Sequence, residues 1–108
     1  MSTFDTAFAM ISENADKIDF SQARRNAEVE MELTGSGGGI MSASLHNGSV
    51  TVRRGEAARP DCIIILSAGD FERLMNGSLS PMAALFSGRI KVEGDMSVLI
   101  YVQELLFS

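Results

Sequence analysis

Apolar and polar residues alternate along the first half of the chain with the period of a β-strand. From Ala27 to Leu33 every second residue is apolar and the three residues between are glutamates, which predicts a half-buried strand with one solvated face. The alternation resumes in 40–46 and 50–54, and Asn47-Gly48 between these runs is the strongest short signal for a hairpin. Residues 27–54 are therefore predicted to form a three-stranded antiparallel meander.

The period changes to that of a helix between residues 67 and 88. Ser67 and Ser80 are in position to cap the starts of two short helices, and Gly77 and Gly88 are in position to end them. Each helix carries an apolar stripe at the i, i+3, i+4 spacing. The stripes consist of Phe71, Leu74 and Met75 in the first helix and Met82, Leu85 and Phe86 in the second. Both stripes are expected to face one interior.

The remaining segments complete a single domain over residues 1–108. Residues 3–14 have apolar side chains at helical spacing and predict an N-terminal helix. The run 62–66 is apolar on both faces, which is typical of a central strand, whereas 89–93 alternates and suits an edge strand. The segment 96–107 is apolar nearly all round, so as a helix it must be buried by the core, a ligand or a second subunit.

Several short motifs follow one another in a fixed order over residues 60–96. They are an apolar strand ending in Leu66-Ser67, the helix start Asp70-Phe71, Asn76-Gly77, Ser80-Pro81-Met82, Phe86-Ser87-Gly88, Ile90-Lys91-Val92 and Gly94-Asp95-Met96. Together they resemble the sterol carrier protein type-2 family of non-specific lipid-transfer domains, and the resemblance extends over residues 27–107. It implies an α/β (α+β) fold with an N-terminal helix, a five-stranded mixed sheet that contains the meander, and helices packed on one face.

The resemblance also implies a hydrophobic tunnel between the helices and the sheet, which in relatives takes fatty acyl chains, acyl-CoA, sterols or phospholipids. The apolar residues of three helices are expected to converge there, although a dry core would use the same spacing. Methionines favour the tunnel, because their flexible thioethers suit ligands of varying shape. The candidate ligand-binding residues are Phe71, Leu74, Met75, Met82, Leu85, Phe86, Met96, Leu99 and Ile100.

The pattern leaves more than one function open. The first is non-catalytic binding, with or without transfer, of a hydrophobic small molecule or lipid. The second is a dimerisation or accessory module that partners a lipid-modifying enzyme, in which the helix at 96–107 forms the interface, for instance of a homodimer. An enzyme would need a polar group inside the pocket, and Ser87, Tyr101 and Gln103 are the nearby candidates.

The sequence contains no evident set of catalytic or metal-binding residues. His46 is the only histidine and stands beside a hairpin turn, where a surface position is favoured. Cys62 lies in an apolar strand, which hides a thiol and raises its pKa. The glutamates at 28–32 have no histidine among them, and the glycine run 35–39 leads into a strand rather than the helix of a phosphate loop. We expect a non-enzyme without metal or cofactor.

The charge distribution argues against two further classes of partner. The net charge is -5 and the nine Lys and Arg residues are scattered, which disfavours nucleic acid and strong electrostatic attachment to anionic membranes. No apolar run is long enough to span a bilayer, so stable membrane insertion is not expected. The start lacks the features of a signal peptide, and the single cysteine forms no internal disulfide. A cytoplasmic protein of bacterial style is predicted.

Overall fold

The computed structural model describes residues 2–17 and 25–97, which form three helices and five strands. In chain order these are α1 (Thr3–Lys17), β1 (Ala27–Thr34), β2 (Gly39–His46), β3 (Ser49–Arg54), β4 (Cys62–Ser67), α2 (Ala68–Met75), α3 (Pro81–Phe86) and β5 (Lys91–Gly94). The predicted elements are therefore confirmed, except for the helix at 96–107. Within that segment the structure describes only a helical start at 96–97.

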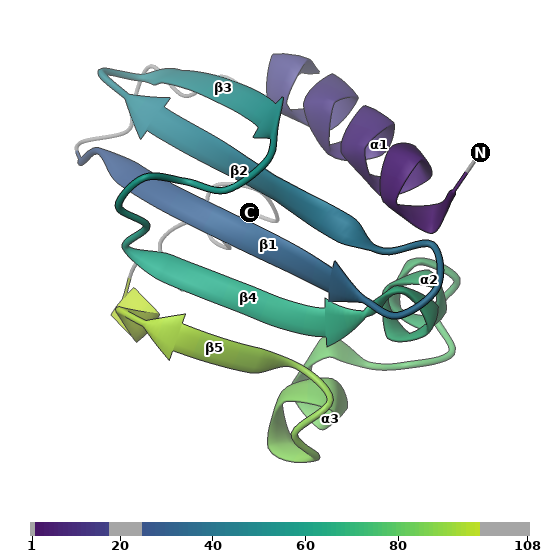
Figure 1. Ribbon diagram of the computed structural model, residues 1–108. Helices are drawn as coiled ribbons and strands as arrows, with labels where there is room; N and C mark the ends of the chain where they lie inside the picture. The colour runs from purple at the N-terminus through teal and green to yellow at the C-terminus, as the bar shows by residue number, and fades with distance from the viewer. Residues whose placement is uncertain (1, 18–24, 98–108) are drawn as a thin grey trace.

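The five strands form one mixed sheet in the order β3-β2-β1-β4-β5 (Figure 1). Strands β1, β2 and β3 are the predicted antiparallel meander, β4 is parallel to β1, and β5 is antiparallel to β4 at the edge. The parallel pair requires a connection that crosses the sheet, and residues 55–61 make it. Strand β4 is accordingly an interior strand, one place removed from the centre of the sheet.

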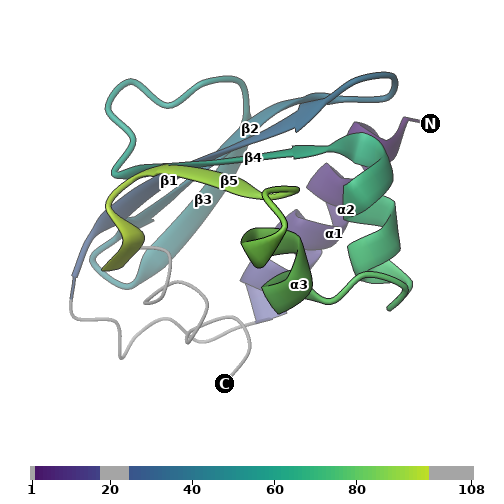
Figure 2. The same ribbon diagram turned by 90° about the horizontal axis from the view of Figure 1, so that it is seen from below.

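The two faces of the sheet are covered by different parts of the chain. Figure 2 shows all three helices on one face and the connection 55–61 on the other. On the helix side, Phe4 and Ala7 of α1 and Phe71 of α2 pack over Leu33 and further buried residues of the sheet. This cluster is the hydrophobic core, and it places α1 and α2 next to each other.

The turns of the meander have the backbone conformations that their sequences favour. Asn47 and Gly48 both have positive φ, at 51° and 82°, as a type I′ hairpin requires. The glycine run 35–39 turns the chain back, and the carbonyl of Gly37 accepts a hydrogen bond of 2.9 Å from the amide of Phe4. A Cβ on Gly39 would lie 2.7 Å from the ring of Phe4, so only glycine allows the start of α1 to rest on this turn.

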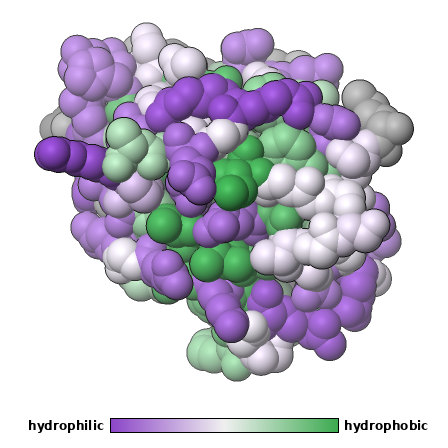
Figure 3. Space-filling view, in the orientation of Figure 1, coloured by the Kyte–Doolittle hydropathy of each residue, from purple (hydrophilic) through white to green (hydrophobic). Residues whose placement is uncertain are grey.

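One glutamate corrects the prediction of a solvated face on β1. Glu30 is buried, because the connection 55–61 covers it, and its Oε1 accepts a hydrogen bond of 2.9 Å from the amide of Ala57. Glu28 and Glu32 on the same face are half-buried. Strand pairing places Ile63 and Ile65 on this face as well, and Figure 3 shows it as an apolar centre surrounded by hydrophilic residues. The alternation of β1 correctly predicted that the three glutamates share one face of the sheet. It did not predict that the connection 55–61 covers part of that face.

The two short helices have the predicted ends. Ser67 Oγ accepts from the amide of Asp70 at 3.0 Å, and Ser80 Oγ accepts from the amide of Ala83 at 3.3 Å. Gly77 and Gly88 follow with positive φ, at 82° and 80°. In residues 2–17 and 25–97 no helix has the length and apolar character needed to cross a membrane.

Candidate ligand-binding groove

A groove of about 360 Å³ lies between α1 and α2 and opens to solvent. Figures 1 and 2 show the two helices as neighbours on the helix side of the sheet. The groove is lined by Thr3, Thr6, Ala7, Met10, Phe71, Glu72, Met75 and Asn76. Helical spacing explains this set, since residues three or four apart lie on the same side of a helix. Each helix therefore contributes one side of the groove.

The lining residues comprise four apolar and four polar side chains. Ala7 and Phe71 are buried and belong to the hydrophobic core, so they form the floor. Met10 and Met75 add long thioether side chains, one from each helix. The polar residues are Thr3 and Thr6 of α1 and Glu72 and Asn76 of α2. An apolar floor with a few polar groups is the usual composition of a small-molecule site.

One hydrogen bond joins the two walls of the groove. Thr3 Oγ1 donates to Glu72 Oε1 at 2.5 Å and so links the first turn of α1 to α2. A second contact holds α1 on the sheet: Arg54 Nη1 lies 2.8 Å from Asp5 Oδ1, and its guanidinium stacks over the ring of Phe8 at 4.6 Å. Hydrogen bonds from Arg54 and then from Ser2 lower the pKa of Asp5 below its usual value. The position of α1, and with it the groove, is fixed from both sides.

The structure brings two of the predicted ligand-binding residues together in this groove, Phe71 and Met75. Leu74 is half-buried and packs against the core, and Leu85 is half-buried on α3. The prediction that the whole stripe of α3 faces the interior is wrong, because the buried residue of this helix is Ala84. Met82 and Phe86 are instead 62% and 84% exposed. Met96 is also exposed, and Leu99 and Ile100 lie outside the described residues.

The contribution of α1 to the groove was not predicted from the sequence. Thr3, Ala7 and Met10 follow the i, i+4, i+7 spacing of one helix face, but two of them are small or polar. A search for large apolar residues overlooks such a face. The signal that could have found it is the small Ala7, which leaves space where a larger side chain would fill it.

The residues excluded as catalytic lie away from the groove. Cys62 is buried in β4, and loss of hydration there raises the pKa of its thiol, with Asp61 and Asp95 adding to the effect. His46 is exposed at the end of β2 beside the hairpin turn. Within 2–17 and 25–97, no group of three or more His, Cys, Asp or Glu residues is arranged to hold a metal ion.

A family model described as the SCP-2 sterol transfer family matches residues 8–107. The chain belongs to this family. Its domains are lipid-binding domains, and the resemblance inferred from the motifs is confirmed. Hydroxysteroid dehydrogenase-like protein 2 of Xenopus tropicalis is 31% identical over 75 residues, which make up 68% of this chain and 18% of that protein. The chain thus spans less than a fifth of the length of that relative.

Solved structures show the same fold at lower identity. The palmitated SCP2L2 of Aedes aegypti superposes with a TM-score of 0.76 and 19% identity, covering 100% of this chain and 96% of that one. The sec-alkylsulfatase Pisa1 from Pseudomonas sp. superposes with a TM-score of 0.68 and 22% identity, covering 87% of this chain and 15% of that one. The predicted fold class, an α+β domain with an N-terminal helix and a five-stranded mixed sheet, is confirmed.

Proposed function

We propose that this family member binds a hydrophobic small molecule or lipid without transforming it, in the groove between α1 and α2. The observation that carries the proposal is the apolar floor of Ala7 and Phe71, flanked by methionines from both helices. The volume of about 360 Å³ falls at the lower end of the range for ligand pockets. A single alkyl chain fits this size better than a bulky ring system.

The exposure of Met75 supports the same conclusion. This residue is 51% exposed although it lines the groove together with the buried Phe71, and a ligand in the groove would cover it. Leu74, Met82, Leu85, Phe86, Met96, Leu99 and Ile100 remain proposed contacts for the part of a ligand that extends beyond the groove. The palmitated form of the Aedes aegypti relative shows that this fold accommodates an acyl chain in another family member.

Non-catalytic binding is favoured by the composition of the groove. Glu72 is the one ionisable side chain among its lining residues, and no metal-ligand set stands beside it in the described part of the chain. Carriage of an intact ligand needs only burial of its apolar surface. Transfer between donor and acceptor surfaces is the extension of this role that the family description suggests.

Chain-length dependence tests the proposed binding directly. Straight-chain alcohols of increasing length should displace the uncharged dye Nile red, each added methylene tightening binding about two- to fourfold until the groove is filled. Met75→Gln should weaken binding about fivefold, because it places an amide against the apolar chain. The matched control is Met82→Gln on α3, which lies outside the groove lining and should leave unchanged the affinity for alcohols short enough to stay within the groove. Absence of saturable dye uptake would refute the proposal.

A second candidate function is that of an accessory module for a lipid-modifying enzyme. The relatives favour it, since the matching segment is a minor part of both hydroxysteroid dehydrogenase-like protein 2 and Pisa1. The exposed Met82 and Phe86 would then contact the enzyme. Phe86→Ser should abolish co-purification with such a partner and leave Nile red binding intact. The homodimer through segment 96–107 stays a prediction, because residues 98–108 lie outside the described residues.

A further inference from the structure

We infer that the groove selects amphiphiles whose polar end is an uncharged hydrogen-bond donor, such as a hydroxyl, and discriminates against carboxylates through Glu72. The inference rests on the proposed function and adds the chemical class of the ligand. Glu72 is the one charged residue among those that line the groove. Its carboxylate is exposed on the rim, where the polar end of a ligand would meet solvent.

The arrangement of Glu72 allows it to accept a hydrogen bond from a ligand. Thr3 Oγ1 donates to Glu72 Oε1, which fixes the carboxylate across the end of the groove at the start of α1. A carboxylate has about four acceptor positions on its two oxygens, so one bond from Thr3 leaves capacity for another donor. A hydroxyl can supply that donor, whereas an ionised carboxylate has none and adds a second negative charge.

In the part of the chain that the structure describes, the arginines on α2 and beside α1 are engaged elsewhere. Arg54 pairs with Asp5 on the sheet side of α1. Arg73, the neighbour of Glu72 in α2, has its Nη1 atom 3.5 Å from Asp70 Oδ1. Neither arginine lines the groove. An anionic head group would therefore meet Glu72 without a cation among the lining residues.

The start of α1 offers little compensation for an anion. Free amide groups at a helix N-terminus commonly bind anions. Here the amides of Phe4, Asp5 and Thr6 already donate to the Gly37 carbonyl, Ser2 Oγ and the Ser2 carbonyl, at 2.9, 3.1 and 3.1 Å. These bonds occupy three of the amide donors in the first turn that would otherwise attract a carboxylate. The rim near Thr3 is thus acceptor-rich and suits a donor.

The test compares two ligands of equal chain length, dodecan-1-ol and dodecanoate, as competitors of Nile red at pH 8 and low ionic strength. A hydroxyl is less strongly hydrated than a carboxylate, so the ratio of the two affinities in the unaltered protein is not diagnostic by itself. The diagnostic quantity is the change in this affinity ratio between the unaltered protein and Glu72→Gln. The glutamine has nearly the size of the glutamate and keeps an oxygen that can accept the hydrogen bond from Thr3. Dodecanoate should bind about tenfold more tightly to this variant, while dodecan-1-ol binds equally well or more weakly.

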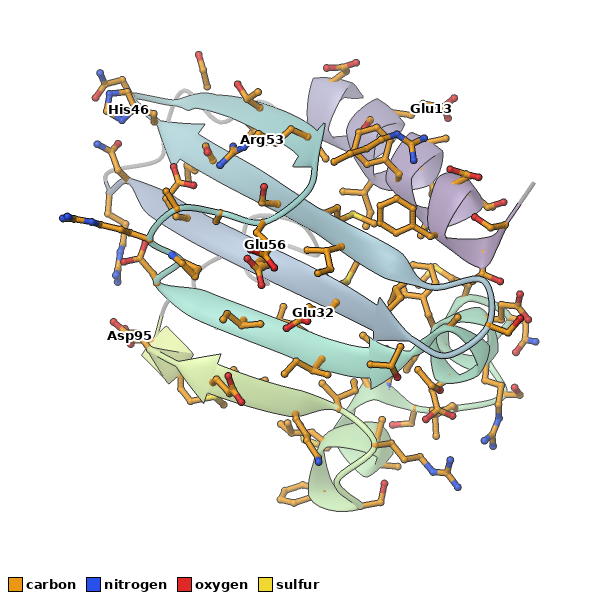
Figure 4. All side chains as sticks on the ribbon, viewed as in Figure 1. Glu13, Glu32, His46, Arg53, Glu56 and Asp95 are labelled. Carbon is orange, nitrogen blue, oxygen red and sulfur yellow. The ribbon has the colours of Figure 1, made fainter. Side chains whose placement is uncertain are left out.

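The matched control is Glu56→Gln, which removes the same charge from the opposite face of the sheet. Glu56 is exposed on the connection 55–61, and Figure 4 shows it in front of the sheet, on the face away from the helices. This variant should leave the ratio unchanged. Added salt should reduce the discrimination in the unaltered protein, because the rim is exposed to solvent.

Each failure has a separate meaning. If Nile red binds but Glu72→Gln leaves the ratio within twofold of the unaltered protein, the head-group inference is overturned and the proposed function stands. The same conclusion follows if Glu56→Gln shifts the ratio as much as Glu72→Gln, since net charge would then be the cause. If none of the three proteins takes up Nile red or dodecan-1-ol, the proposed function fails and the inference fails with it.

Discussion

Helices α2 and α3 begin with the same kind of serine cap, end before the same kind of glycine and carry the same apolar spacing, yet they are placed differently. Helix α2 buries Ala68 and Phe71 and forms one wall of the groove. Helix α3 buries Ala84, and its large residues Met82 and Phe86 are exposed. An amphipathic stripe therefore indicates which side chains can be buried, and the neighbouring elements decide whether they are.

The difference follows from what each helix meets. Helix α2 packs against α1, β1 and β4. In the part of the chain that the structure describes, no helix or strand packs against α3 as closely. The carbonyl of Ala84 accepts hydrogen bonds from the amides of Arg89 and Ile90, so the chain turns back across α3 at its one buried residue. The packing of α2 against three other elements gives it a structural role, whereas the exposed apolar residues of α3 are available to contact a ligand or a partner.

The largest expected effect on stability distinguishes Phe71 of α2 from Phe86 of α3. Phe71→Ala should lower the free energy of unfolding by about 3 kcal/mol, since it leaves a cavity in the core. Phe86→Ala should change it by less than about 0.5 kcal/mol, because that ring is 84% exposed. Urea unfolding measures both. An equal loss in the two variants would mean that Phe86 is buried in solution, and the contrast between the helices would be wrong.

Two adjacent alanines of α3 sharpen the comparison at a smaller scale. Ala84→Leu should lower the free energy of unfolding by about 1–3 kcal/mol, because the side chain at this position is fully buried and a larger one does not fit. Ala83→Leu on the exposed side should be near neutral. The pair is compared by thermal unfolding. Similar values for both would show that Ala84 is not on a more closely packed side of α3 than Ala83.

The two helix caps test how much each helix contributes to global stability. Ser67→Ala should lower the free energy of unfolding by about 1 kcal/mol, the usual loss for an N-cap. Ser80→Ala removes the same kind of hydrogen bond, but α3 can fray without exposing the core, so its effect should be smaller. Amide hydrogen exchange should show increased exchange confined to α3 in the second variant. Increased exchange in α2 as well would indicate that the two helices unfold together.

The smallest expected effect concerns pH and the docking of α1, against which α2 packs. The hydrogen bonds from Arg54 and Ser2 lower the pKa of Asp5 in the folded state. A lowered folded-state pKa stabilises the protein at pH values above the unfolded-state pKa of about 3.9, and this stabilisation is lost as the pH falls through the folded-state value. The difference in urea midpoint between the unaltered protein and Asp5→Asn should accordingly shrink as the pH is lowered from 6 through that range.

Asp16→Asn is the control for this experiment, because Asp16 is an exposed carboxylate on the same helix. Its urea midpoint should follow that of the unaltered protein across the pH range. A constant difference for Asp5→Asn down to the lowest pH would show that the ionised carboxylate of Asp5 is not what holds Arg54.

Most of the fold could be predicted because its signals are local. Three of these signals depend only on residues a few positions apart in the chain: the alternation in β1, the Asn47-Gly48 turn and the serine caps. The ligand-binding set could be predicted only in part, because it depends on which elements meet. Phe71 and Met75 lie in the groove, while the wall formed by α1 was missed and the stripe of α3 was wrongly assigned to the interior.

The sequence by itself determined the elements, their ends and the family, since capping, turn conformation and period are properties of short stretches of chain. Only the tertiary structure decided that Glu30 is covered by the connection 55–61, that Ala7 and Phe71 form the floor of a groove, and that Phe86 is exposed. The physical reason is that burial depends on the atoms supplied by distant segments. A side chain of given polarity is buried where such a segment covers it and exposed where none does.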